Sequence, residues 1–588
     1  MRHFPFNRKW HCLFVTRLQP AGLRRTTYSL LLFLLGTRRL RPAGLRRAAF
    51  SLLLLFLLAS CKARQQADLC IINATIYTVD SAFNKAEAMA VKDGKILAIG
   101  PTKEITAAYE AAETWDAGGQ FIYPGFIDAH AHFFSYGLGL QTVDLTGTGS
   151  WEEILHKLSA YAKEHPQGWI IGRGWDQNDW PVKTFPDNKK LNELFPQRPV
   201  LLTRIDGHAA IANAKALQDA GVRPGTTLTG GEVEVKNGRL TGMLIDNAID
   251  LVAMHIPGPQ PEQVRSALLQ AQQNCFAVGL TTVDDCGLGF REVLFLDSLQ
   301  QAGQLKMRIY ALLSDAPANY DFLMRKGVIK TDRMHVRGFK VYADGALGSR
   351  GACLLEPYSD RPGWKGFLLS NPHHFDSVAA LLYANNFQMC THAIGDSGNR
   401  TILNIYAKHL KGKNDRRWRI EHAQVVNEKD FHLFGDYAIT PSVQPTHATS
   451  DMYWAGERLG PAREKGAYAF NDLLQQNGWI ALGTDFPVED ISPFKTFYAA
   501  VVRKDAKGWP ENGYQRENAL SREDALRGMT IWAAQSNFEE KEKGSLEKGK
   551  LADFVITDKD LMTAAPEELL HIAVQRTYIN GELVYKRQ

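Results

Sequence analysis

The sequence predicts an α/β protein built on a barrel of eight parallel strands. The first observation is a set of eight short apolar runs, most of them rich in Val, Ile or Phe, as buried parallel strands require. The second is that helix-like segments, such as 261–278, 375–386 and 463–477, separate several of these runs. Eight strand–helix units in succession are typical of a (β/α)8 TIM barrel. The expected strands are 121–129, 280–285, 307–313, 335–342, 387–392, 418–422, 438–443 and 479–485.

Short strands and turns are expected on both sides of the barrel, at 68–124 and 541–588. Apolar and polar residues alternate there, and the Asp-Gly pair at 93–94 and the Asn-Gly pair at 580–581 are strong hairpin signals. We interpret the two segments as one small β-sandwich formed from both ends of the mature chain. Two separate β appendages would give the same pattern, so that alternative stays open.

The first two expected barrel strands lie about 150 residues apart, which is too far for a single crossover helix. The intervening insert, about 140–260, has a strand of its own at 200–205 and many aromatic residues. We therefore expect a barrel domain over 125–540 in which this insert forms a cap or subdomain above the barrel mouth.

The charge of the chain excludes one class of partner. The 588 residues carry a formal net charge of +5, but residues 1–60 contain eleven Lys or Arg and no acidic residue. The remainder has 57 basic and 63 acidic residues, so it is mildly acidic and lacks the basic footprint of a nucleic-acid-binding protein. The seven cysteines form no CxxC pair, and a chain of this size needs no disulfide framework.

Residues 1–61 have the pattern of an export signal. Two apolar runs, 28–35 and 48–59, each follow a basic stretch and are shorter than the roughly 20 residues of a membrane-spanning helix. The two stretches are copies shifted by 22 residues. The second ends Leu-Ala-Ser-Cys, which resembles a bacterial lipobox and predicts lipidation of Cys61. We expect an exported protein of the cell envelope, lipid-anchored to a bacterial membrane; an ordinary signal peptide with an incidental cysteine is the alternative.

A constellation of polar residues marks the ends of the expected barrel strands. The first strand ends PGFIDAHAH, which places His130 and His132 two residues apart. Side chains at i and i+2 of a strand point to the same side, so the two imidazoles could grip one metal ion. Barrel enzymes build their active sites at the carboxyl ends of the strands. Four further candidates lie at or near such ends: Lys340, His392, His422 and Asp485.

Each of these four residues has a structural alternative. Lys340 could be a snorkelling surface lysine, His392 and His422 could be hydrogen-bonded core histidines, and Asp485 could be a helix N-cap. Taken together, six candidate residues distributed over five strands favour a metal site over six separate structural explanations.

The pattern of these residues resembles that of a known family, the amidohydrolase superfamily. The resemblance rests on the order H-x-H, Lys, His, His, Asp and on the phrases PGFIDAHAHF, FKVYADGALGSRGA, HAIGD, RIEHAQ and GTDFPV. These phrases are similar to the N-substituted formamide deformylase-like branch, amidohydrolase family 3, and the similarity covers most of the mature chain. It implies a two-metal hydrolase in which His130, His132 and Asp485 bind one ion while His392 and His422 bind the other.

The resemblance also assigns a role to Lys340, whose carbamate, formed with CO2, would bridge the two metals. An ammonium group has no lone pair for a metal, and a buried lysine with a lowered pKa suits this carboxylation. Zinc is the expected metal because the ligands are imidazole and oxygen, and Mn2+, Fe2+ and Co2+ are the open alternatives. A bridging hydroxide would attack an amide or N-acyl carbon, and Asp485 would pass its proton to the leaving amine.

Substrate contacts are expected from the insert and from the end of strand seven. The phrase Arg-Ile-Asp-Gly-His at 204–208 resembles a family segment that reaches the active site, and His208 is its best candidate. A structural role is an equal alternative for every residue of this set. The candidates are His208, Asp206, Trp175, Asp176 and His447.

Two other functions stay open beside the cleavage of a small-molecule amide. The same metal site could catalyse deamination, decarboxylation or isomerisation, although mononuclear deaminases lack the bridging lysine and Lys340 argues against them. Alternatively, the chain could be a non-catalytic binding lipoprotein. The sequence leaves the substrate and the formation of a homo-oligomer open.

Overall fold

The computed structural model describes residues 64–588. The predicted export signal at 1–61, its 22-residue repeat and the lipidation site Cys61 lie outside the described residues. Within residues 64–588, no helix is both long enough and apolar enough to cross a membrane. The cysteines of this part of the chain are all free thiols.

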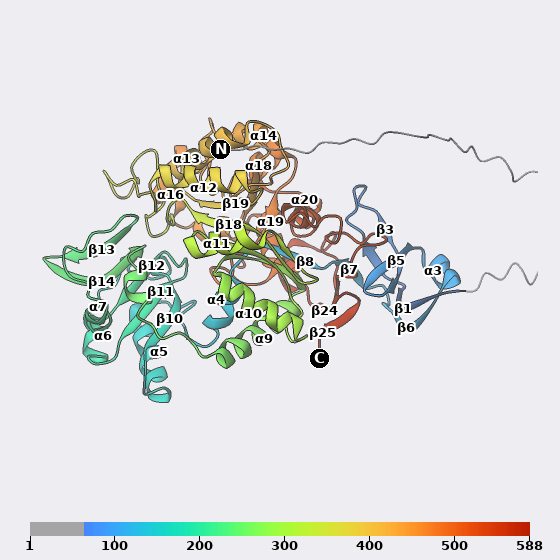
Figure 1. Cartoon of the computed structure of the whole chain (residues 1–588), viewed down its shortest axis with the longest axis horizontal. Helices are drawn as coiled ribbons and strands as arrows, with labels where there is room; N and C mark the ends of the chain where they lie inside the picture. Colours follow the sequence, from blue (N-terminus) through green and yellow to red (C-terminus); the bar gives the residue numbers. More distant parts are fainter. Residues whose placement is uncertain (1–63) are drawn as a thin grey trace, which may run out of the picture. The chain divides into compact units, whose positions relative to one another are not determined.

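Eight parallel strands form the barrel, in a path in which each strand is hydrogen-bonded to the next (Figure 1). They are β8 (Phe126–Ala131), β15 (Leu280–Leu288), β16 (Arg308–Ser314), β18 (Met334–Tyr342), β19 (Gln388–Ala393), β20 (Arg419–His422), β21 (Thr440–Val443) and β22 (Ala481–Leu482). Backbone hydrogen bonds just beyond β22 close the ring onto β8: Asp485 N–H donates to His130 O over 2.7 Å, and His132 N–H donates to Phe486 O over 2.9 Å. The predicted barrel is confirmed.

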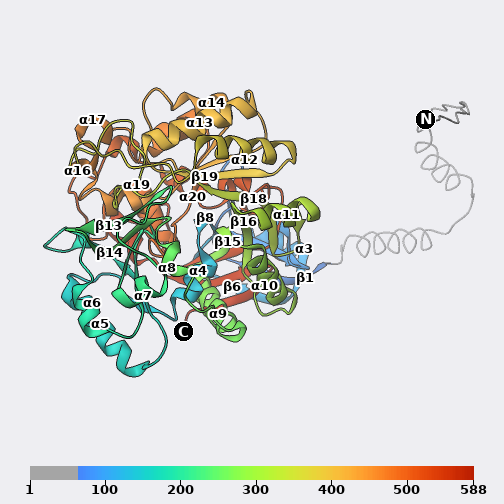
Figure 2. The ribbon, with the colours of Figure 1, turned by 60° about the vertical axis from the view of Figure 1, so that its left-hand side comes forward.

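Helices lie on the outer side of the strands (Figure 2) and share one apolar core with them. Two of them are the helices expected at 261–278 and 375–386. The helices of the first half of the barrel are α9 (Pro261–Ala277), α10 (Phe290–Gln301), α11 (Pro317–Lys326), α12 (Pro372–Ala384) and α13 (Asp396–Leu410).

The expectation of one helix over 463–477 is wrong. Two short helices occupy this region, α17 (Pro461–Glu464) and α18 (Phe470–Asn477). Between them Tyr468 has a φ of 53°, which a right-handed helix cannot accommodate.

The expected first strand, 121–129, divides into two strands that belong to different sheets. β7 (Phe121–Pro124) pairs with the terminal strands, whereas β8 enters the barrel. Gly125 separates them, and a Cβ at this position would lie 2.4 Å from the side chain of Thr281. Only glycine allows the chain to pass this close to β15 as it turns from one sheet to the other.

The two ends of the described chain meet in one β-sandwich. One sheet has the order β5-β4-β1-β6 and the other β25-β24-β23-β7-β2-β3. In the second sheet the C-terminal strand β23 pairs antiparallel with β7, and side chains from both ends of the chain share one core. These strands are β1 (Gln65–Ile72), β2 (Thr75–Tyr77), β3 (Lys85–Ala86), β4 (Ala88–Lys92), β5 (Lys95–Gly100), β6 (Tyr109–Asp116), β23 (Phe554–Thr557), β24 (Val574–Ile579) and β25 (Glu582–Lys586).

Both predicted hairpin turns are present in this sandwich. Asp93 and Gly94, between β4 and β5, have φ values of 49° and 74°. Asn580 and Gly581, between β24 and β25, have φ values of 53° and 69°. Two successive positive φ angles fit a two-residue type I′ turn. Because strands from both ends of the described chain share one sheet and one core, the single sandwich is the correct alternative to two separate appendages.

The insert after the first barrel strand carries a six-stranded sheet of its own, in the order β13-β14-β12-β11-β10-β9. It has a separate apolar core and is tied to the barrel by polar contacts. For example, Asn247 Nδ2 donates to Leu369 O over 3.2 Å, and an Arg458 N–H donates to Asn178 Oδ1 over 3.1 Å. The strands are β9 (Val143–Asp144), β10 (Ile170–Trp175), β11 (Val200–Arg204), β12 (Ala209–Ala212), β13 (Gly231–Lys236) and β14 (Arg239–Asp246).

A buried ion pair connects the barrel to the sandwich. Arg308, at the start of β16, donates from Nε to Asp553 Oδ2 over 2.6 Å and from a terminal nitrogen to Asp553 Oδ1 over 3.0 Å. Both side chains are almost fully buried. Because a buried guanidinium without its carboxylate is costly, we expect Asp553→Ala to lower the free energy of unfolding by about 3–5 kcal/mol in urea titrations.

The matched control is the exposed pair Lys190–Glu152, whose side chains are 51% and 68% exposed. Glu152→Ala should leave the urea midpoint nearly unchanged, because exposed ion pairs contribute little to stability. Equal effects of the two substitutions on the urea midpoint would contradict this view of the junction.

Candidate metal centre

The six predicted ligand residues lie together at the carboxyl ends of the barrel strands. His130 ends β8, and His132 follows it directly as the residue before helix α4 (Phe133–Gly139). Five of the six line a cavity of about 1440 Å³ between the barrel and the insert. His130 lies beneath it and is fully buried. The five lining residues are His132, Lys340, His392, His422 and Asp485.

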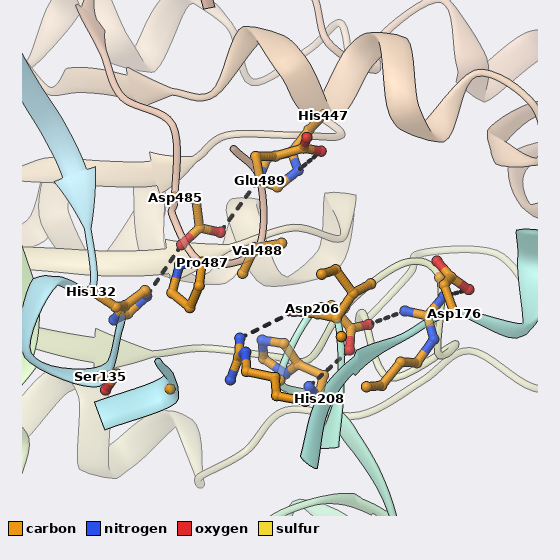
Figure 3. A pocket seen from close by; sticks show the side chains of 18 of the residues that line it. His132, Ser135, Asp176, Asp206, His208, His447, Asp485, Pro487, Val488 and Glu489 are labelled. Carbon is orange, nitrogen blue, oxygen red and sulfur yellow. Dashed lines mark hydrogen bonds and ion pairs between the residues drawn. The ribbon is translucent and has the colours of Figure 1, made fainter. Parts of the chain in front are cut away.

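Short distances connect these side chains. Lys340 Nζ lies 3.1 Å from His130 Nε2, and Asp485 Oδ1 lies 3.2 Å from His132 Nε2 and 3.6 Å from His130 Nε2. Figure 3 shows His132 and Asp485 facing each other. The ring of His422 lies 4.8 Å from that of His130, and potential ligand atoms of His130, His422 and Asp485 all fall within 4.8 Å of one another.

Several polar atoms of this cluster are buried without a hydrogen-bond partner among the described residues. They are His392 Nε2, His422 Nδ1 and Asp485 Oδ1. A buried polar atom left unpaired costs roughly 1–3 kcal/mol, so a group of three in one place calls for a ligand. Imidazole nitrogens and a carboxylate oxygen are the donor set that divalent transition metals take.

The protonation of the histidines suits this role. Burial lowers the pKa of His130 to about 4 and lowers the pKa of His132, while burial takes the pKa values of His392 and His422 well below the ordinary value. All four rings are therefore neutral at pH 7, and only a neutral imidazole has a lone pair to offer.

Backbone strain is concentrated at the same place. His422 has a φ of 72° and Asp485 a φ of 64°, both in the left-handed region that non-glycine residues rarely adopt. Consecutive residues of a strand normally point to opposite sides. Because His422 leaves the strand conformation, it and its neighbour Glu421 both reach His130. Such strain persists where the surrounding structure enforces it and is typical of functional sites.

Glu421 is a member of the centre that the sequence analysis missed. Its Oε2 lies 2.5 Å from His130 Nδ1, and its Oε1 lies 2.8 Å from Arg419 Nε. All three side chains are fully buried. Burial alone would raise the pKa of Glu421, but Arg419 and His130 hold it well below its ordinary value. A carboxylate fixed on Nδ1 leaves His130 Nε2 as the free nitrogen facing Lys340 and Asp485.

The surroundings of Lys340 oppose the lowered lysine pKa that suits carboxylation. Burial acts to lower the pKa of this fully buried amine, but its interactions with Tyr342, Cys286, Glu421 and Asp485 raise the pKa above the ordinary value. Burial by itself predicts the opposite direction.

His447 connects Asp485 to the rim of the cavity. Its Nε2 lies 3.3 Å from Asp485 Oδ2 and its Nδ1 lies 3.5 Å from Glu489 Oε1, so His132, Asp485, His447 and Glu489 form a continuous series of polar contacts (Figure 3). Burial would lower the pKa of His447, but the two carboxylates raise it well above its ordinary value. Among these four side chains, His447 is therefore the group that carries an acidic proton at neutral pH.

The insert contributes His208 to the same cavity. Its Nδ1 lies 2.5 Å from Asp246 Oδ1, and its ring lies 5.0 Å from that of His392. Asp206 and Asp176 also line the cavity, yet both are ion-paired with the buried Arg204 (Figure 3).

Trp175 does not line the cavity. Its indole is fully buried in the core of the insert, and its N–H donates to Leu202 O over 2.9 Å. Asp176, the first residue after β10, lines the cavity. Trp175 points to the opposite side of the strand, because side chains alternate along a strand.

Comparison with known proteins places these motifs in a family. The model of the amidohydrolase family matches residues 113–585. The chain is 32% identical to the protein LONG AFTER FAR-RED 3 of Arabidopsis thaliana, over 88% of this chain and 92% of the relative. It is 30% identical to the putative amidohydrolase YtcJ of Bacillus subtilis, over 87% and 98%. It is 27% identical to the N-substituted formamide deformylase of Arthrobacter pascens, over 89% and 99%.

A solved structure agrees with this assignment. The crystal structure of an uncharacterized metal-dependent hydrolase from Pyrococcus horikoshii matches with a TM-score of 0.69 and 27% identity, covering 85% of this chain and 99% of that one. The expected resemblance to the formamide deformylase-like branch is confirmed. Because the family model spans residues 113–585 and two relatives are at least 30% identical over most of their length, this chain belongs to the amidohydrolase family of metal-dependent hydrolases.

Proposed function

We propose that this protein hydrolyses a C–N bond of a small amide or N-acyl compound. The observation that carries the proposal is the convergence of four neutral histidines, Lys340 and Asp485 at the carboxyl end of one barrel. The N-substituted formamide deformylase among the relatives supports a carbon–nitrogen bond as the target.

Two divalent metal ions are part of the proposal, and the residues present fit them. His130, His132 and Asp485 would hold one ion, and His392 and His422 the other. The unpartnered atoms His392 Nε2, His422 Nδ1 and Asp485 Oδ1 support this set. When bound, such ions lower the pKa of a water and polarise a substrate carbonyl, and zinc is the metal best matched to these ligands.

Lys340 would join the two ligand sets as a carbamate. Its neutral amine forms a bond to the carbon of CO2 and loses one proton, which gives an anionic oxygen ligand. The Nζ atom already lies 3.1 Å from His130 Nε2. Cations held by the neighbouring ligands oppose an ammonium group and lower its pKa, which would reverse the upward shift caused by the surrounding acids.

The side chains around the centre would transfer protons and bind the substrate. As the attacking water adds to the carbonyl carbon, Asp485 accepts its proton and returns it to the leaving nitrogen, so that the C–N bond breaks with release of an amine. His447 orients Asp485 through Oδ2. His208, held at Nδ1 by Asp246, is left with Nε2 to donate to a substrate oxygen.

A broad panel of N-formyl, N-acyl and ring amides tests this proposal on residues 62–588. We expect amine release from at least one class, and a loss of about 100-fold or more in kcat for Asp485→Asn, because proton transfer then fails. Asp490→Asn is the matched control, since this cavity-lining carboxylate pairs only with Lys495 among the described ion pairs. Metal-loaded protein that is inert to every amide would favour deamination, decarboxylation, isomerisation or a binding role.

Glu421→Gln tests whether the contact of Glu421 with His130 strengthens metal binding. Because the glutamine cannot hold His130 as an anionic acceptor, metal affinity should fall by about 10–100-fold in competition with a chelator. Glu539→Gln is a matched control, since Glu539 is an equally buried, ion-paired glutamate on His335, Lys330 and Lys543. Metal affinity that falls equally in both variants would show a general loss of stability instead.

A further inference from the structure

Arg173 is a cationic side chain of the cavity that the mechanism above leaves without a role. It extends from β10 and lines the cavity beside the metal centre. One terminal nitrogen donates to Ile205 O over 3.1 Å. The guanidinium lies close to Gly207, where a Cβ would be 3.4 Å from that nitrogen. Its Nε is buried and has no hydrogen-bond partner among the described residues.

The charge of Arg173 is not neutralised by the described part of the chain. Among the ion pairs of residues 64–588 none includes Arg173, whereas the neighbouring Arg204 holds both Asp176 and Asp206. Burial lowers the pKa of Arg173, but a guanidinium stays protonated at neutral pH. The two arginines therefore differ in kind: Arg204 is a structural ion pair, and Arg173 is an unpaired cation facing a cavity.

Most carboxylates that line the cavity already have partners. Asp246 pairs with His208, Asp315 with His374 and Asp490 with Lys495. Four lining carboxylates have no cationic partner among the described residues. Asp144, Asp179 and Asp250 are exposed to solvent, and Asp451 accepts hydrogen bonds from Tyr468 and Gln424. Arg173 is thus a half-buried cation of the cavity that no carboxylate of the described residues pairs with.

His208 adds a hydrogen-bond donor to the same cavity. Asp246 holds its Nδ1 over 2.5 Å, which leaves Nε2 as the ring nitrogen available to a ligand. Arg173 bonds to Ile205 and lies against Gly207, which directly precedes His208 in the chain. Two donors from the insert, one guanidinium and one imidazole, therefore lie next to each other at the cavity wall.

We propose that Arg173, assisted by His208, binds a carboxylate of the substrate, so that the amides cleaved here carry an anionic group, as N-acyl amino acids do. A guanidinium matches a carboxylate as a planar fork, and hydrogen bonds between charged groups are about twice as strong as neutral ones. The inference rests on the proposed hydrolase function. Arg173 is then a residue that determines the preference of the hydrolase for substrates with a carboxylate.

Matched pairs of N-acyl amino acids and their carboxamides test the inference, because the two members differ only in charge at one end. Acyl release is followed for each, and the ratio of kcat/KM for acid over carboxamide is compared between variants. We expect a ratio of at least about 10 in the wild type, which Arg173→Met reduces about tenfold or more. Arg173→Lys should restore part of it. A ratio taken within one variant is insensitive to the fraction of protein that folds.

Lys495→Met serves as the matched control, since Lys495 is a cavity-lining cation whose charge Asp490 already neutralises. Its acid-to-carboxamide ratio should stay at the wild-type value. A wild-type ratio near one, or a ratio that Arg173→Met leaves unchanged, would overturn the inference. A purely structural Arg173 would also be revealed, because its loss would then slow both members of each pair equally.

The same pairs separate this inference from the proposed hydrolase function. If nothing is cleaved, their binding is measured by calorimetry. A preference for the acid that disappears in Arg173→Met would keep the carboxylate site while the hydrolase proposal fails. A preference that survives in Arg173→Met but disappears on metal removal would assign the carboxylate to the metal centre and refute the role of Arg173.

Discussion

The register between β8 and the segment that follows β22 is the constraint on which the rest of the site depends. Asp485 N–H bonds to His130 O, and Asp128 accepts hydrogen bonds from both the backbone and the hydroxyl of Thr484. A Cβ at Gly483 would lie 2.5 Å from His130 N, so only glycine allows this approach. These contacts close the barrel and bring Asp485 against two histidines that lie some 350 residues earlier in the chain.

From this seam a row of buried charges runs into the barrel. Lys340 contacts His130, His130 contacts Glu421, and Glu421 contacts Arg419, which also bonds to Asp284 over 2.7 Å. A buried charge is tolerated when it is paired and hydrogen-bonded, and here the Glu421 carboxylate lies between the neutral ring of His130 and the guanidinium of Arg419. The row fixes the orientation of the ligands from below, while the insert closes the site from above with His208 and Arg173.

The sequence was sufficient to predict the features that depend on local pattern. Buried parallel strands are apolar throughout, which made the barrel visible, and an H-x-H pair at a strand end places two rings on one side. Features that depend on long-range register were not predictable. Glu421 resembled an ordinary strand residue beside His422, and its role became apparent only through the positive φ of that histidine. Gly125 gave no sign that the first strand would divide there.

The insert was the least predictable part. Local pattern does not place its motif residues relative to the barrel. The sequence therefore predicts Trp175 as a cavity residue although it belongs to the core, and it does not distinguish the unpaired Arg173. At Lys340, the interactions with neighbouring side chains raise the pKa more than burial lowers it, and the sequence does not show these neighbours. Export and the lipid anchor at Cys61 stay predictions from the sequence.

The metal content of residues 62–588, expressed with added bicarbonate, tests the central claim most directly. It should be measured beside Lys340→Ala and the ion-paired cavity lysine variant Lys495→Ala. The account predicts two divalent ions per chain in the wild type and in Lys495→Ala, and a clear loss in Lys340→Ala. One ion that is unaffected by Lys340→Ala, or no bound metal at all, would contradict it.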